Sequence, residues 1–440
     1  MQQVFYKLAD SLASLAKPDE VLLANLAGER SDFVRFNKSA VRQPGSVLQQ
    51  YLRLELVRGR RHASMTIMFS ADDRTNCASV AKAVADLRSS LGELPEDPYL
   101  LFAEQVHNTE QIGPDRLPDA ADAVDAVLAA AGGLDLVGLY AAGEITRGFA
   151  NSLGQRNWFS THSFNLDWSF YHAADKAVKT QYAGFAWDAA AFGDKMDLAR
   201  RQLDVMKRQP KTVPPGEYRV YLSPAAVGEV MNMLCWGGFG LKAHRTRTTS
   251  LLKLIEGEQT FAPGVALTEN TREGLAANFS AEGFIKPGSV SLVQGGRHAG
   301  ALASPRSAKE YAVPTNGADR WESPASLDMA AGELSLADVP ARIGEGVYVN
   351  TLWYLNYSDR PGGRITGMTR FATFWVEGGQ IAAPLNVMRF DETVYRMFGR
   401  NLLGLTASRD FIPDSETYDS RSTASMRLPG ALIDNFAFTL

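Results

Sequence analysis

Residues 344–390 read GEGVYVNTLWYLNYSDRPGGRITGMTRFATFWVEGGQIAAPLNVMRF, and this stretch has the pattern of an antiparallel β-sheet. Its runs GVYVNTLWYLNYS and GMTRFATFWVEGGQIAAPL are rich in Val, Thr, Tyr, Phe and Trp, which favour strands. Glycine and proline lie between the runs and favour turns. The runs SVSLVQGG and ALIDNFAFTL have the same character. We therefore predict that the second half of the chain is mainly antiparallel β.

A few helices are predicted among these strands. The strand-like run EYRVYLS is followed by PAAVGEVMNMLC, residues 224–235, which reads as a helix. Pro224 suits the first turn of a helix, where its missing N–H costs nothing. The glycines of the following WGGFG are predicted to end this helix.

The first half alternates helices with strand-like runs. Residues 3–16 place four apolar side chains on one stripe, as an amphipathic helix does: Val4, Leu8, Leu12 and Leu15. Short strands separated by glycines and polar residues are predicted within 21–70, and Asn76 is predicted to cap a helix over 77–91. These patterns predict the α+β class, with antiparallel N-terminal sheets that carry helices on one face.

A domain boundary is predicted near residue 210. The segment MKRQPKTVPPGEY, residues 206–218, holds three prolines, a glycine and several charges, which suit neither helix nor sheet. We therefore divide the chain into an N-terminal α+β domain, 1–209, and a C-terminal, mainly β domain, 210–440. A further division of the first domain into 1–95 and 96–209 is left open.

Composition favours a cytoplasmic location. The formal net charge is −4 and no long Lys/Arg run exists, so a nucleic-acid partner is not expected. Only two cysteines are present, Cys77 and Cys235, which suits a reducing compartment. The N-terminus lacks the pattern of a signal peptide, and no long apolar stretch predicts a membrane span.

Known catalytic signatures are missing. The sequence has no G-x-S-x-G elbow and no phosphate-binding loop of the Walker A type. No two of the six histidines lie three to five residues apart, so no helix is expected to offer two imidazoles to one metal ion. Cys235 is predicted to be a small apolar core residue at a helix end.

Several stretches, taken together and in order, resemble the TldD/PmbA metallopeptidase family. In the first half they are GERSDFVRFNKSAVRQ and FANSLGQRNWFSTHSF, the latter with Asn151, Ser152 and Gly154 in an Asn-Ser-x-Gly pattern. In the second half they are the helix at 224–236, the run RTRTTSLLKLIEGEQTFAPGVALTEN and residues 344–390. The resemblance covers most of the chain.

The sequence departs from this family at the zinc site. Members of the TldD type carry H-E-x-x-x-H on a helix and a cysteine on a later strand, and the glutamate serves as base toward metal-bound water. The corresponding stretch here is Met233–Gly238, which holds neither histidine nor glutamate, and the strand GVYVNTLWYLNY holds no cysteine. The resemblance therefore implies a TldE/PmbA-type chain with no catalytic residue and no metal ligand of its own.

The resemblance further implies a heterodimer whose TldD-type subunit holds the zinc. An unfolded or small modified peptide would enter the dimer chamber as an extended strand and be hydrolysed there. Six residues are predicted to face the peptide or the partner: His244, Arg245, Arg247, Asn350, Tyr354 and Asn356.

Two other interpretations stay open. One is a homodimeric peptide-binding or regulatory protein without peptidase activity. The other is an enzyme whose metal site has moved to Cys235 with His244 or His298. The sequence does not identify the peptide.

Overall fold

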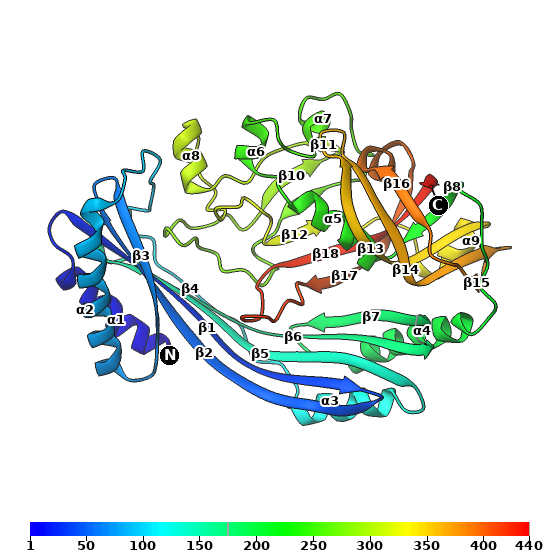
Figure 1. Ribbon diagram of the computed structural model, residues 1–440, viewed down its shortest axis with the longest axis horizontal. Helices are drawn as coiled ribbons and strands as arrows, with labels where there is room; N and C mark the ends of the chain where they lie inside the picture. Colours follow the sequence, from blue (N-terminus) through cyan, green and yellow to red (C-terminus); the bar gives the residue numbers. More distant parts are fainter. Residues whose placement is uncertain (174–175, 440) are drawn as a thin grey trace.

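The computed structural model describes residues 1–173 and 176–439, and it confirms the predicted α+β class. Within these residues the strands form two sheets, one of seven and the other of eleven strands. The long strands of the first sheet bend beneath the second (Figure 1). No helix of the described residues is long and apolar enough to cross a membrane.

The N-terminal sheet has the strand order β3-β2-β1-β5-β6-β4, and β7 pairs with β6. All its pairs are antiparallel except β4 with β6. Its strands are β1 (Glu20–Asn37), β2 (Ala40–Arg58), β3 (Arg61–Met68), β4 (Thr109–Ile112), β5 (Asp135–Asn151), β6 (Arg156–Ala173) and β7 (Lys176–Gly184). The helices of this half are α1 (Gln2–Leu15), α2 (Asp73–Ser90), α3 (Ala120–Ala130) and α4 (Ala189–Met206).

Alternating side chains give β1 two different faces. Leu22, Ala24 and Leu26 point into a core that includes Phe5 and Leu12 of α1. Leu23 and Asn25 between them, and Glu29 further along the strand, belong to the opposite face because successive side chains alternate across a strand. This opposite face meets the second half of the chain, since Leu23 packs in one cluster with Ala277 and Phe279.

The C-terminal sheet has the order β11-β10-β9-β12-β18-β16-β14-β13-β8, with β15 on β14, β17 on β18, and β8 also paired with β18. Its strands are β8 (Gly216–Leu222), β9 (Leu267–Glu269), β10 (Val290–Gln294), β11 (Arg297–His298), β12 (Ser326–Met329), β13 (Gly346–Asp359), β14 (Arg364–Glu377), β15 (Gln380–Pro384), β16 (Arg389–Thr393), β17 (Leu402–Pro413) and β18 (Ser425–Phe438). The helices are α5 (Pro224–Cys235), α6 (Leu241–Arg245), α7 (Leu252–Ile255), α8 (Pro305–Tyr311) and α9 (Val339–Ile343).

Helix α5 forms where the sequence predicts it and packs on β13 and β18. The hydroxyl of Ser223 caps it by accepting a hydrogen bond from the Ala226 N–H at 3.3 Å, and Pro224 lies in its first turn. It ends at Cys235, and Gly237 just beyond has φ +76°, a backbone conformation that glycine adopts without strain. Val227, Val230 and Leu234 are buried in the core of the C-terminal sheet.

The segment between β17 and β18 joins the two sheets. It reaches down to the N-terminal sheet (Figure 1), where the Arg421 guanidinium donates hydrogen bonds to the Ser163 and Gly143 carbonyls at 2.8 and 3.2 Å. The Arg421 N–H donates to the buried Glu29 carboxylate at 3.2 Å. Arg421 is 5% exposed, so this contact is shielded from water.

The predicted boundary falls between the two sheets. Helix α4 ends at Met206 and β8 begins at Gly216, with one isolated bridge, Lys211 to Leu385, in between. The division into domains 1–209 and 210–440 nevertheless remains a proposal, because it also requires that each part fold as a unit.

Candidate functional site

A cavity of about 690 Å³ lies beside α5, bordered by β7, α4, β13 and the β17–β18 segment. Glu229, Asn232 and Cys235 of α5 line it, as do Lys179, Asp410 and Asn350 from other elements. Its volume is in the range of small-ligand pockets. Because acids and bases both line it, the cavity does not have the charge of a simple anion or cation site.

The three α5 residues offer little chemistry at neutral pH. Burial raises the pKa of the Glu229 carboxyl, and the charge of Lys179 opposes this shift. Burial also raises the pKa of the Cys235 thiol far above its usual range, so this thiol is not a ready nucleophile. Cys235 is buried, as the sequence predicts, whereas Asn232 is exposed.

Polar contacts across the cavity connect β7, α4, β13 and β17. Lys195 of α4 forms an ion pair with Asp410 of β17 at 2.8 Å. The Asn350 side-chain amide donates to the Lys179 carbonyl at 2.7 Å, and the Asn350 carbonyl accepts from the Ser223 hydroxyl at 2.7 Å. Asn350 thus holds β13 against β7 at the edge of the cavity.

His244 lies away from this cavity, in α6. Its Nε2 donates to the Gly238 carbonyl at 2.8 Å, and its ring centroid lies 5.2 Å from that of His298. Burial lowers the pKa of both imidazoles, and the nearby His298 adds to the effect on His244. Both rings are therefore neutral near pH 7.

Arg245 and Arg247 are exposed beside α6 and do not line the cavity. Arg247 has φ +60° and forms an ion pair with Glu256. Arg245 lies in the last turn of α6, where a cation suits the helix C-terminus.

Tyr354 and Asn356 lie on an exposed ribbon formed by β13 and β14. The register shifts between Trp353 and Asn356, so a bulge there turns side chains outward. Tyr354 is 68% exposed and Trp353 46%, and the Arg370 guanidinium lies 3.9 Å from the Trp353 ring centroid. The six predicted residues therefore occupy three places: α6, the cavity edge and the ribbon.

Among residues 1–173 and 176–439, no group of three or more His, Cys, Asp or Glu side chains is placed to hold a metal ion. His244 and His298 lie close together, as the relocated-site interpretation requires. The Nε2 of His244 is already used by the Gly238 carbonyl, and Cys235 lines a cavity that neither histidine lines.

Sequence reasoning missed most residues that line the cavity. Lys179 of β7 and Lys195 of α4 lie on consecutive elements, whereas Asp410 of β17 is 215 residues beyond Lys195. None stands in a local motif, so only the pairing of the strands brings them together.

Fold and cavity together define a two-sheet α+β protein with a helix facing a cavity between the sheets. Residues 215–440, just over half of the chain, match the model of the PmbA/TldA metallopeptidase C-terminal domain. The chain belongs to this family, the TldD/PmbA family, as its sequence predicts.

Solved structures share the whole fold. TldE from Thermococcus kodakarensis matches with a TM-score of 0.78 and 15% identity, over 99% of this chain and 100% of that one. A proposed modulator of a DNA gyrase from Thermotoga maritima matches with 0.77 and 14%, over 99% and 100%. A proposed DNA gyrase modulator from Bacteroides thetaiotaomicron matches with 0.73 and 18%, over 99% and 98%. No curated protein sequence matches significantly.

Proposed function

We propose that this chain is the non-catalytic partner subunit of a TldD/TldE-type zinc metallopeptidase that hydrolyses unfolded or small modified peptides. One observation carries the proposal. The stretch that corresponds to the zinc motif, Met233–Gly238, covers the end of α5 beside the cavity, and it holds no histidine or glutamate. The zinc and its water would then belong to a TldD-type subunit.

The chain would contribute binding and enclosure. The cavity beside α5 is lined by strands and by the amide of Asn350, which suits a peptide held in an extended conformation. A cytoplasmic location remains a prediction, in keeping with the two free cysteines. A role on DNA has less support, because the net charge is −4.

The first test compares the chain alone, the TldD-type protein of the same cell alone, and the mixture of both. We expect less than about 0.1 zinc per chain and no cleavage of an unfolded peptide by the chain alone, since the metal would bind to the partner. Activity should appear in the mixture and disappear with a chelator.

Other outcomes would contradict the proposal in distinct ways. Stoichiometric zinc and activity in the isolated chain would favour a relocated metal site. A stable homodimer that binds peptide, ignores the TldD-type protein and never cleaves would favour the peptide-binding alternative.

The exposed ribbon is proposed as part of the partner interface. Aromatic residues with an arginine beside them are typical of interface hot spots, and Trp353, Tyr354 and Arg370 form such a group. We predict that Trp353→Ala and Tyr354→Ala each weaken heterodimer formation by about 1–3 kcal/mol, or roughly 5- to 150-fold in Kd. Titration calorimetry with the TldD-type subunit measures this.

The control is Trp321→Ala, since Trp321 is 70% exposed on a different segment and stacks with Arg320. Unchanged Kd values for the two ribbon variants would place the interface elsewhere.

A further inference from the structure

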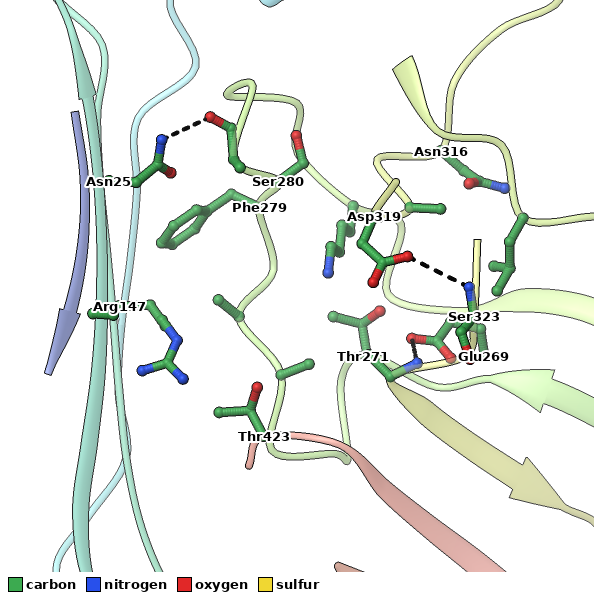
Figure 2. Close-up of a pocket in the computed structure, with 18 of the residues that line it drawn as sticks. Asn25, Arg147, Glu269, Thr271, Phe279, Ser280, Asn316, Asp319, Ser323 and Thr423 are labelled. Carbon is green, nitrogen blue, oxygen red and sulfur yellow. Dashed lines mark hydrogen bonds between the residues drawn. The ribbon is translucent and has the colours of Figure 1, made fainter. Parts of the chain in front are cut away.

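A second cavity, of about 480 Å³, lies between the N-terminal sheet and the C-terminal half. One wall consists of β1, β2 and β5, and the other of the segments that contain Glu269, Phe279 and Asp319 (Figure 2). Ser323 lines both this cavity and the one beside α5, so the two are neighbours with separate linings.

Arg147 of β5 extends into this cavity from the sheet wall (Figure 2). It donates one hydrogen bond, to the Thr146 carbonyl at 2.9 Å, and forms no ion pair within the described residues. A guanidinium has five donors, and leaving buried donors without acceptors costs free energy. Burial lowers the pKa of Arg147, yet arginine remains charged at neutral pH. The side chain is half-buried, and the charge of the Glu29 carboxylate opposes the effect of burial without an ion pair between the two, so guanidinium donors remain free to face the cavity.

Lys286 adds a second cation from the opposite wall. It is half-buried and, within the part of the chain that the structure describes, it forms no hydrogen bond or ion pair through its ammonium group. The acids whose charges act on it are Glu269, Asp319 and Glu282, and the first two already accept hydrogen bonds. Glu269 accepts from the Ala325 and Ser326 N–H groups at 3.2 and 3.0 Å, and Asp319 accepts from the Trp321 N–H at 3.0 Å.

The rest of the lining is largely apolar. Phe279, Ala277 and Leu302 are buried around the cavity. Phe279 and Ala277 pack in one cluster with Phe149 of β5, which fixes the position of this wall against the sheet. An apolar body is thus favoured next to the two cations.

We infer that this cavity binds a small carboxylate with an apolar body, its carboxylate held by Arg147 and Lys286 and its body against Phe279. Arginine binds a carboxylate in a bidentate, planar geometry, which explains a fork-shaped donor here. Such a ligand is either a free apolar acid or the C-terminal residue of a short peptide. The inference does not depend on the proposed peptidase role.

Titration calorimetry on the full chain tests the site with N-acetylphenylalanine and with its neutral C-terminal amide. We expect the acid to bind at least about tenfold more tightly than the amide, since the amide loses charge-assisted hydrogen bonds. Arg147→Gln and Lys286→Gln should each raise the Kd of N-acetylphenylalanine by about tenfold or more. The matched control Arg30→Gln should leave binding unchanged, because Arg30 is exposed on β1 and does not line the cavity.

The dipeptide Ala-Phe separates the two sources. Binding at least about tenfold tighter than that of N-acetylphenylalanine identifies a peptide C-terminus, and comparable binding identifies a free acid; both support the inference. Equal binding of acid and amide, binding that ignores both variants, or preferential Arg147-dependent binding of inorganic phosphate would overturn it. Thermal melting controls for folding, and Arg147→Gln should change the melting temperature little, since the half-buried Arg147 side chain makes a single hydrogen bond.

Discussion

Replacing Arg421 with alanine is expected to lower the free energy of unfolding by about 2–4 kcal/mol. The guanidinium donates to the Ser163 carbonyl and hydroxyl at 2.8 and 2.7 Å and to the Gly143 carbonyl at 3.2 Å. Alanine would leave these buried acceptors without donors. Urea denaturation followed by fluorescence and by circular dichroism measures the change.

Arg421 is also one of the side chains that join the C-terminal half to the N-terminal sheet. Burial lowers its pKa to about 10, and the charge of Glu29 opposes this shift. The guanidinium is still charged at pH 7, so its burial is tolerated only because its hydrogen bonds are made. Both probes should still follow one transition, at a lower urea concentration, because Trp168 of the N-terminal sheet and Tyr348 and Phe374 of the C-terminal sheet belong to one buried core.

Two further variants make this prediction specific. Tyr418→Ala lies in the same segment, and since Tyr418 is 94% exposed it should change stability by less than about 0.5 kcal/mol. Arg421→Lys keeps the charge but not the planar fork, and an intermediate loss is expected. If Arg421→Ala unfolds like the Tyr418 variant, the Arg421 hydrogen bonds make no net contribution to stability.

Helix α5 was the most predictable element of the fold. Pro224 and the glycines after Trp236 are local signals, and both ends of the helix follow them. The N-cap at Asn76 was wrong. Asp72 caps α2 instead, while Asn76 turns inward and its side-chain amide donates to the Ser70 carbonyl at 2.8 Å. Both residues are good caps, and only the tertiary position of Ser70 decides between them.

The first strand is longer than the sequence predicts, and the difference has a physical reason. The sequence predicted several short strands here, but β1 runs unbroken through Gly28 from Glu20 to Asn37. A Cβ atom at Gly28 would lie 2.3 Å from the Thr146 hydroxyl on the neighbouring strand. The close approach of β5 therefore requires a glycine at this position. Because β5 lies over a hundred residues away in the chain, the local sequence pattern does not show this requirement.

The candidate site was predictable only where one element carries it. The burial of Cys235 could be predicted from the helix alone. The six residues predicted to face the peptide or the partner do not lie together. One reason is that β13 passes from the cavity edge at Asn350 to the exposed ribbon at Tyr354 within a few residues. Whether these residues face a peptide or a partner remains a prediction.

Replacing Gly143 with alanine should have the largest effect of all, a loss of about 4 kcal/mol or more, seen as insoluble protein or an early urea transition. Gly143 has φ +144°, and a Cβ atom there would lie 2.1 Å from the Arg30 carbonyl oxygen of β1. The obstacle is backbone in a paired strand, so it yields only if β1 and β5 separate. The same shift would displace the Gly143 carbonyl that accepts from Arg421.

Substitutions at two other glycines distinguish the effect of backbone strain from that of a steric clash. Gly154 has φ +101° and Gly45 no positive φ, and a Cβ atom meets nothing within 4 Å at either position. Gly154→Ala should therefore cost about 1–2 kcal/mol through backbone strain alone, and Gly45→Ala should be neutral or slightly stabilising. If Gly143→Ala lowers the free energy of unfolding no more than Gly154→Ala does, β1 can shift easily. The sheet that supports both cavities is then less rigid than its strand pairing implies. A cost well above that of Gly154→Ala assigns the excess to the packing of β5 against β1, the strand pair from which Arg147 and Asn25 reach the second cavity.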